Sequence, residues 1–271
     1  MFNYIFYHET NPKTPERPVE DARANTGNIF VVADGITIDP LENGTYPNPS
    51  PSGNVSKIIC SECIECLSNL SEIKTGDIKK ALQKANKKVD KYNRGLPNYE
   101  EELSKAYNVG SAVVAVGVIQ DNRLIYGVLD DCYVSVFSDD LVDHPQLESY
   151  VQKTAKFFDA NYDWSKTEDR RFFRRDLRNT TYTFGGETYG YGALDGADGY
   201  EKYLQLGEVE LKAHDLVCVY TDGFIQPLKD LDFVKKLKFE ISSDEIRNYI
   251  ESYCVENGFV KEKTCFFIKI G

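Results

Sequence analysis

The stretch FVVADG, residues 30–35, decides the fold of this chain. Residues 30–33 are apolar and rich in side chains that suit a buried β-strand. Asp34 and Gly35 follow directly, and the glycine lets the backbone bend sharply beside the acid. The stretch therefore predicts a strand that holds a carboxylate on a rigid support at its end.

A second strand with the same ending lies late in the chain. LVCVYT, residues 216–221, runs into Asp222-Gly223. An isolated Asp-Gly pair is ordinary turn chemistry, and that interpretation stays open for each of the two. Two such pairs closing apolar strands favour two carboxylates brought side by side. Such carboxylates repel each other and take up protons unless a divalent cation lies between them.

The composition bounds the class of protein. The chain has 271 residues, 41% of them hydrophobic, and a net charge of -11, which argues against a nucleic-acid or anionic-membrane partner. No apolar run approaches the roughly 20 residues that a membrane span needs. The N-terminus lacks the pattern of a secretory signal, and seven dispersed cysteines fit reduced thiols. We therefore expect a cytoplasmic protein.

The pattern of elements predicts an α+β fold. Residues 54–70 and 77–92 have the apolar spacing of amphipathic helices, and three strands at 110–119, 123–129 and 133–137 are separated by tight turns. Further helices are expected at 147–158, 228–238 and 243–256, and strands at 1–8, 209–211 and 264–270. Consecutive antiparallel strands between helix pairs do not fit a parallel sheet. We expect a single domain spanning residues 1–271.

The acidic side chains indicate the kind of metal. Asp21, Asp34, Asp131 and Asp222 all lie at or next to predicted strand ends, whereas the three histidines are scattered. A site made of carboxylates selects Mg²⁺ or Mn²⁺ over zinc. Two such ions roughly 4 Å apart can clamp a phosphate and lower the pKa of a water molecule, which then attacks without a side-chain nucleophile.

These motifs together resemble the metal-dependent type 2C serine/threonine protein phosphatases, in particular bacterial members. The resemblance spans nearly the whole chain and rests on the order of five elements: Glu20-Asp21-Ala22, residues 30–35, Gly110-Ser111-Ala112-Val113, Asp130-Asp131 and residues 215–223. It implies a four-layer α-β-β-α sandwich, in which two antiparallel sheets are flanked by helices. It also implies a metal pair in a cleft at one end of the sandwich.

The resemblance implies a role for each matching position. Asp34 bridges two Mn²⁺ or Mg²⁺ ions and Gly35 offers its carbonyl oxygen. Asp222 holds one ion, and Asp21, supported by Glu20, acts on the other. Asp131 lies near a third, looser ion. The substrate implied is a phosphorylated protein, with a partner kinase to phosphorylate it and with neither nucleic acid nor membrane as a partner.

Two expected site positions depart from the family pattern. Lys261 stands where the family has its last aspartate ligand, and Glu262 is a candidate replacement ligand one position along. The slot of the phosphate-binding arginine is Glu16, with Arg17 next to it as a candidate phosphate contact. Two functions therefore stay open: an active phosphoserine/phosphothreonine phosphatase, and a catalytically silent domain of the same fold that binds or regulates a phosphoprotein.

Three other features each allow two interpretations. Cys60, Cys63 and Cys66 could bind a metal, but packing of small buried side chains is favoured. Five arginines within residues 170–178 could receive a phosphorylated substrate or could balance nearby acids on a solvated helix. Residues 185–199, rich in glycine, form either a substrate flap or a surface loop.

Overall fold

Two five-stranded antiparallel sheets form the centre of the molecule. The computed structural model describes residues 2–9, 17–41, 43–103, 108–145, 147–240 and 245–271. The first sheet has the order β1 (Phe2–Glu9), β12 (Lys263–Ile270), β11 (Leu216–Thr221), β6 (Cys132–Phe137) and β7 (Asp143–His144). The second has the order β10 (Leu204–Glu210), β5 (Arg123–Leu129), β4 (Ala112–Gln120), β3 (Ile29–Gly35) and β2 (Ala22–Thr26).

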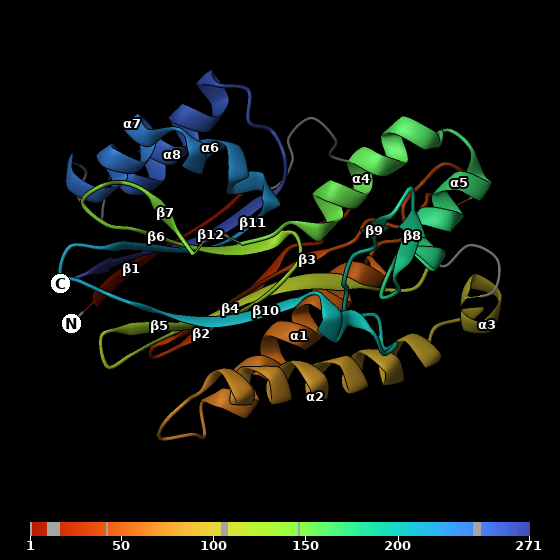
Figure 1. Cartoon of the computed structure of the whole chain (residues 1–271), viewed down its shortest axis with the longest axis horizontal. Coiled ribbons are helices and arrows are strands. Elements are labelled where there is room, and N and C mark those ends of the chain that lie inside the picture. The colour runs from red at the N-terminus through yellow and green to blue at the C-terminus, as the bar shows by residue number, and fades with distance from the viewer. Residues whose placement is uncertain (1, 10–16, 42, 104–107, 146, 241–244) are drawn as a thin grey trace.

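Helices cover the outer face of each sheet, as Figure 1 shows. Helices α1 (Pro51–Leu67) and α2 (Thr75–Arg94) pack on the second sheet, and α6 (Ile225–Lys229), α7 (Leu231–Lys235) and α8 (Ile246–Glu256) pack on the first. A short helix α3 (Tyr99–Glu101) follows α2. The prediction of an α+β, four-layer α-β-β-α sandwich is confirmed. No helix within the described residues is long and apolar enough to cross a membrane.

Three apolar cores lie between these four layers. The core between the sheets includes Phe30 and Val32 from β3 and Val217 and Val219 from β11, all fully buried. Alternate residues of β3, such as Val31, face α1 and α2 instead. Both faces of the central strands are therefore apolar, which is why their sequences are continuous hydrophobic runs without alternation.

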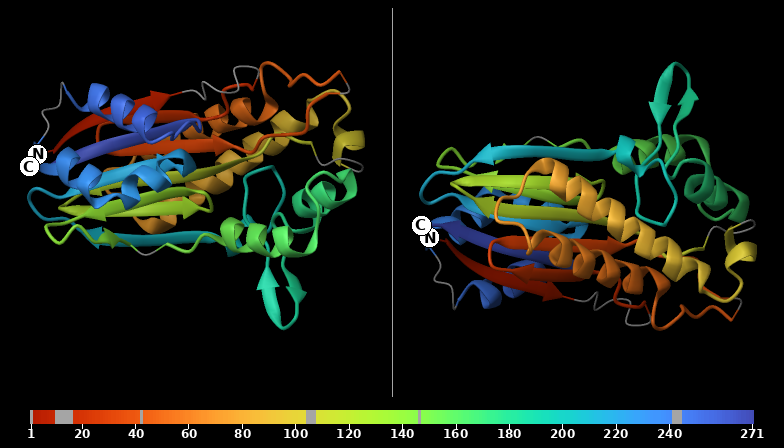
Figure 2. Two further views of the ribbon diagram at one scale, coloured as in Figure 1. Left: turned by 90° about the horizontal axis from the view of Figure 1, so that it is seen from above. Right: turned by 90° about the horizontal axis from the view of Figure 1, so that it is seen from below.

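A separate lobe lies beside the end of the sandwich where β3 ends. It contains α4 (Tyr150–Asn161), α5 (Thr167–Arg171), a π-helical turn (Phe172–Asp176) and a hairpin of β8 (Tyr182–Phe184) and β9 (Glu187–Tyr189). Figure 2 shows the hairpin projecting from the body of the molecule. Its small aromatic core includes Phe158, Phe173 and Tyr191.

Several predicted boundaries were wrong for local reasons. Helix α1 begins at Pro51, three residues earlier than predicted, because the Ser50 hydroxyl accepts a hydrogen bond from the Gly53 amide and caps it. The helix predicted at 228–238 is divided into α6, α7 and a π-helical turn (Lys236–Glu240). Strand β10 begins at Leu204, five residues before the predicted strand, because it pairs along the whole of β5.

The remaining predicted elements have these outcomes. Helix α4 begins three residues later than expected, at the Ser149 cap. Of the glycine-rich stretch 185–199, predicted as a flap or loop, the first residues belong to the hairpin 182–189, which turns at Gly185 and Gly186, both with positive φ, and residues 190–199 form an irregular connection. Residues 243 and 244, the predicted cap of the last helix, lie outside the described residues.

Candidate metal and phosphate site

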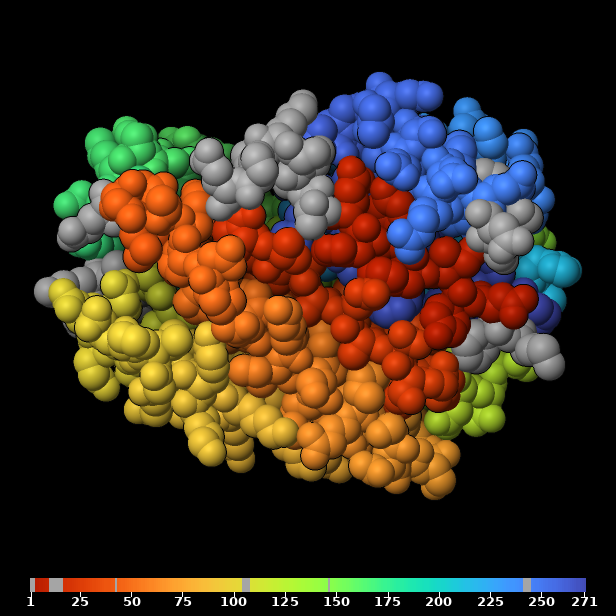
Figure 3. Space-filling model, turned by 180° about the vertical axis from the view of Figure 1, so that it is seen from behind, coloured from red at the N-terminus to blue at the C-terminus, as the bar shows by residue number. Residues whose placement is uncertain are grey.

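The end of β3, the turn after β11 and the segment leading into β2 border one cavity of about 580 Å³. All seven residues that the sequence singled out for chemistry line it: Arg17, Asp21, Asp34, Gly35, Asp131, Asp222 and Glu262. Figure 3 shows the molecule from behind, where the red N-terminal segments lie between α1 and α2 below and the blue C-terminal helices above. The cavity therefore joins residues from both ends of the chain.

The end of β3 is packed too closely for any residue but glycine at position 35. A Cβ atom there would lie 2.9 Å from the Glu20 carbonyl oxygen, the Glu20 Cβ and the carbonyl carbon of Ser52. The Gly35 amide donates to that same Glu20 carbonyl at 3.2 Å. Position 35 therefore holds the Glu20-Asp21 segment directly beside Asp34.

Two hydroxyl groups orient the Asp21 carboxylate. Its Oδ2 accepts hydrogen bonds from Thr221 Oγ1 at 2.8 Å and from Thr264 Oγ1 at 2.6 Å. The Thr264 amide in turn donates to Thr221 Oγ1. Asp21 is only 7% exposed, so these bonds replace water around a buried acid.

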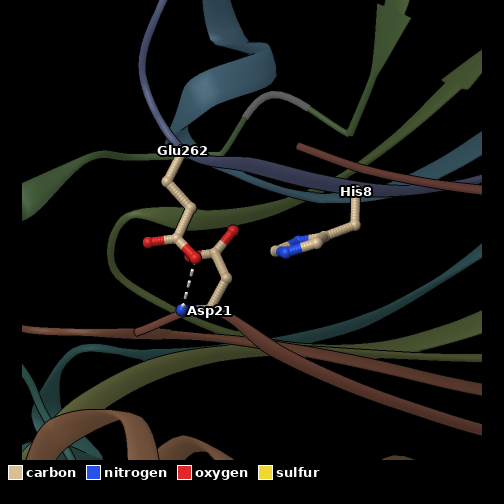
Figure 4. Close-up of side chains that lie close together, drawn as sticks. All are labelled: His8, Asp21 and Glu262. Carbon is tan, nitrogen blue, oxygen red and sulfur yellow. Dashed lines mark hydrogen bonds between the residues drawn. The ribbon is translucent and has the colours of Figure 1, made fainter. Parts of the chain in front are cut away.

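Glu262 reaches the segment before β2 from the other sheet. Its two carboxylate oxygens accept hydrogen bonds from the amides of Glu20 and Asp21, each at 3.2 Å. Among the described residues, His8, Asp21 and Glu262 form a group whose ligand atoms lie within 4.8 Å of one another. Figure 4 shows the His8 ring directed toward the two carboxylates.

The Glu20 side chain helps to hold the segment before β2 in position. Its carboxylate accepts hydrogen bonds from Ser50 Oγ and Thr37 Oγ1, both at 2.5 Å. Ser50 also caps α1, so one hydroxyl connects the start of that helix to the acid next to Asp21. The sequence-based role of Glu20 as a supporting residue fits this geometry.

The acids of the cavity disfavour each other's charged forms. Burial and then Glu262 raise the pKa of Asp21 to about 8, and burial followed by repulsion from Asp21 and Asp222 raises the pKa of Asp34 well above its usual value. Burial raises the pKa of Asp131 as well, with Asp222 adding to it. A group of carboxylates that must lose protons together is the donor set that a hard divalent cation fits.

Next to Asp222, a positively charged side chain, Lys261, lines the cavity. Lys261 Nζ lies 2.7 Å from Asp222 Oδ2, and 72% of the Lys261 side chain is exposed. Burial disfavours the charged ammonium, but attraction by Asp222, Asp131 and Asp34 outweighs this and raises its pKa. The donor set therefore fits a divalent ion on the Asp21 side better than on the Asp222 side.

Asp131 and Arg17 border the cavity with different surroundings. Asp131 Oδ1 accepts a hydrogen bond from the Tyr133 hydroxyl at 2.7 Å. Arg17 is exposed, and its guanidinium carbon lies 5.7 Å from the centre of the Tyr46 ring. Glu16, the slot of the family's phosphate-binding arginine, lies outside the described residues.

Sequence reasoning missed His8, Thr221 and Thr264 as neighbours of Asp21. His8 Nδ1 lies 2.9 Å from Thr264 Oγ1, because β1 pairs with β12 so that these two residues are directly opposite. Only the long-range register of the strands reveals this proximity. Thr221 could have been found, because it comes immediately before Asp222 at the end of a predicted strand.

The arginine cluster matches its solvated-helix interpretation only in part, whereas the cysteines match packing. Arg175 pairs with the nearby Asp176, but Arg170 and Arg174 pair with the distant Asp39, and the buried Arg178 pairs with Asp195. Cys60 and Cys63 are buried in the core under α1. The described part of the chain contains no group of candidate metal ligands that includes a cysteine.

Comparison with known proteins places the fold. No family model and no curated protein matches the sequence. Solved structures do match across both chains. A serine/threonine phosphatase of S. agalactiae is 13% identical, with a TM-score of 0.66 and 100% of each chain covered. The phosphatase PstP/Ppp of Mycobacterium tuberculosis is 13% identical, with a TM-score of 0.64 and coverage of 99% of this chain and 98% of that one.

A third matching structure contains metal ions. The catalytic domain of serine threonine protein phosphatase PstP in complex with two manganese ions is 13% identical, with a TM-score of 0.65, and covers 100% of this chain and 99% of its own. At these identities the likeness concerns the fold, and it agrees with the architecture implied by the resemblance to the type 2C family. The chain has the fold of the bacterial serine/threonine phosphatases.

Proposed function

We propose that this protein is a Mg²⁺- or Mn²⁺-dependent phosphomonoesterase that acts on phosphoserine or phosphothreonine in proteins. One observation carries the proposal: the aspartates at positions 21, 34, 131 and 222 border a single cavity on a phosphatase fold. The raised pKa values of Asp21, Asp34 and Asp131 support a bound cation that lets these acids ionise together. The phosphatases of the same fold, one of them solved with two manganese ions, support the reaction and the cofactor.

Each residue of the cavity has a proposed task. Asp34 and Asp21 hold a divalent ion, with the Gly35 carbonyl and Glu262 as further oxygen donors, and Asp131 adds to the negative charge of the cavity. When bound, such an ion supplies a Lewis acid that lowers the pKa of a water molecule and neutralises charge on a phosphate. Asp222 completes the acidic wall, and Arg17 at the rim contacts the phosphate oxygens of the substrate.

The proposed substrate and setting follow from the same site. An open cavity bordered by an arginine suits a phosphorylated side chain presented by a protein, and a partner kinase then supplies that substrate. All seven cysteines are free, which supports a reducing, cytoplasmic setting.

A catalytically silent role is the second candidate, and one contact favours it. Lys261 places an ammonium 2.7 Å from Asp222, where the resembling family has an aspartate ligand. A chain that has lost its metals could still bind a phosphoprotein through Arg17 and Lys261. This candidate predicts phosphopeptide binding without hydrolysis.

Hydrolysis of para-nitrophenyl phosphate and of a phosphothreonine peptide with Mn²⁺ tests the proposal. We expect turnover that a chelator abolishes and that Asp34→Asn and Asp222→Asn each lower by about a hundredfold or more. Asp121→Asn is the matched control, because Asp121 is an exposed turn residue away from the cavity. Metal-independent turnover, or full activity of Asp34→Asn, contradicts the proposal. Peptide binding without turnover supports the silent candidate.

A further inference from the structure

The segment before β12 is fixed against the turn that carries Asp222. A Cβ atom on Gly223 would lie 2.2 Å from the Glu262 carbonyl oxygen and 2.5 Å from the Lys263 Cβ. Strand pairing places Tyr220 opposite Cys265, and the Thr264 amide donates to Thr221 Oγ1 at 3.0 Å. The fold therefore sets the segment that carries Lys261 beside the turn that carries Asp222.

Lys261 uses that position to place a positive charge inside the cavity. Its Nζ donates to Asp222 Oδ2 at 2.7 Å, and Lys261, Asp34 and Asp131 all line the same cavity. An ammonium at this distance neutralises the carboxylate that would otherwise share a divalent ion. A divalent ion bound to Asp222 would lie next to a like charge, which opposes its binding.

Among the described residues, neither Asp21 nor Glu262 forms an ion pair with a lysine or arginine, in contrast to Asp222. The cation nearest in sequence, Lys263, is directed away and pairs with Glu9 at 2.8 Å. Asp21 and Glu262 line the cavity, and with His8, which is not among the lining residues, they form a group whose ligand atoms lie within 4.8 Å of one another. The two carboxylates are oxygen donors that suit Mn²⁺ or Mg²⁺.

We propose that the Lys261 ammonium permanently occupies one of the two cation positions of this cavity, so that each chain binds a single divalent ion, on the side of Asp21 and Glu262. The inference rests on the proposed function only for the presence of that ion. It distinguishes this chain from the phosphatase of the same fold that was solved with two manganese ions. Lys261 is then the residue that sets the metal content of the site.

Equilibrium dialysis of the full chain against Mn²⁺, with metal counted by elemental analysis, tests the inference. We expect one ion per chain for the natural sequence and two for Lys261→Asp, which adds a carboxylate beside Asp222. Lys261→Met removes the ammonium without adding a ligand, and we expect a second, weaker ion. Lys87→Asp, an identical charge change on an exposed position of α2, keeps one ion.

Electron paramagnetic resonance of the Mn²⁺-loaded protein gives an independent readout. A single ion gives the spectrum of isolated Mn²⁺, whereas Lys261→Asp gives the spectrum of a spin-coupled pair. Two ions in the natural protein show that Lys261 swings aside, and that result overturns the inference. One ion in both Lys261→Asp and Lys261→Met also overturns it.

The two proposals fail in different measurements. Bound Mn²⁺ without any hydrolysis contradicts the proposed function and leaves the single-ion inference standing. Hydrolysis with two bound ions contradicts the inference and leaves the function standing. Thermal melting of each variant identifies any variant that does not fold. The number of Mn²⁺ ions bound by the natural protein tests the single-ion inference without the variants.

Discussion

At the scale of single residues, the cavity gathers acids whose charges conflict. Asp21 is held by the hydroxyls of Thr221 and Thr264, which favour its charged form, yet burial and Glu262 still raise its pKa to about 8. In the unfolded chain the same carboxyl has a pKa near 3.8. The folded protein therefore holds a proton at neutral pH that the unfolded chain has lost.

The sign of this difference predicts how stability depends on pH. Because the folded pKa of Asp21 is raised, its contribution is fully present below the unfolded value and is lost as pH rises through about 8. Without metal we expect the melting temperature to fall over this window. A bound cation favours the ionised acids, so we expect Mn²⁺ to raise the melting temperature more at the alkaline end than at the acidic end.

Scanning fluorimetry with and without Mn²⁺ across this pH range measures the effect. Asp21→Asn removes the titrating group, so its melting temperature should depend less on pH and respond less to Mn²⁺. Asp121→Asn, in an exposed turn, should behave as the natural protein does. A metal-induced shift that is the same at both ends of the range would contradict the raised pKa.

At the scale of elements, the start of α1 and the segment before β2 form one unit. The Ser50 hydroxyl accepts from the Gly53 amide and donates to Glu20 Oε1 at 2.5 Å. The helix cap and the support of the acidic segment thus depend on one side chain. A substitution at the start of α1 should therefore alter the position of Asp21.

Replacing Ser50 by alanine tests this connection. We expect a loss of about 1 to 2 kcal/mol of unfolding free energy, because both a cap and a bond to a buried carboxylate are removed. We also expect weaker Mn²⁺ binding, because Glu20 is freed to move. Ser56→Ala, whose hydroxyl only donates to the Ser52 carbonyl within α1, is the matched control.

Denaturant unfolding and Mn²⁺ titration of the two variants separate the two effects. Ser56→Ala should bind Mn²⁺ as the natural chain does. If Ser50→Ala loses stability but keeps its Mn²⁺ affinity, the inference that Ser50 supports the acidic segment through Glu20 is wrong.

The sequence predicts elements best where local patterns decide them. The strand at 30–35 was found because its apolar residues form a continuous run that ends in Asp-Gly, and the helices α1 and α2 because their apolar residues recur with a helical period. The extent of β10 was not predicted, because its half-buried residues form a strand through long-range pairing with β5. The π-helical turn at Phe172–Asp176 lies between α5 and the aromatic core of the lobe, where no repeating pattern marks it.

At the scale of the whole molecule, the sandwich brings together the two strand ends that carry Asp34 and Asp222. Strands β3 and β11 lie in different sheets, packed face to face through Phe30, Val32, Val217 and Val219. The turns after both strands open into the same cavity. Asp34 and Asp222 are therefore neighbours of one site although they lie far apart in the chain.

The candidate site could be found from sequence only in part. Asp34, Asp131 and Asp222 were found because each follows a predicted strand, and Asp21 and Glu262 through the resemblance to the phosphatase family. The contact between His8 and Thr264 depends on the register of β1 against β12, and the contact between Lys261 and Asp222 depends on how the segment before β12 packs on Gly223. Such contacts join segments that lie far apart in the sequence, so no local sequence pattern predicts them.

Anomalous diffraction from crystals grown with Mn²⁺ tests the central claim most directly, because it shows whether and where the cavity holds a cation. We predict one anomalous peak within bonding distance of Asp21 and Asp34, with the Lys261 ammonium still on Asp222. A cavity without any peak at saturating Mn²⁺, with Asp21 and Asp34 left bare, would contradict the account.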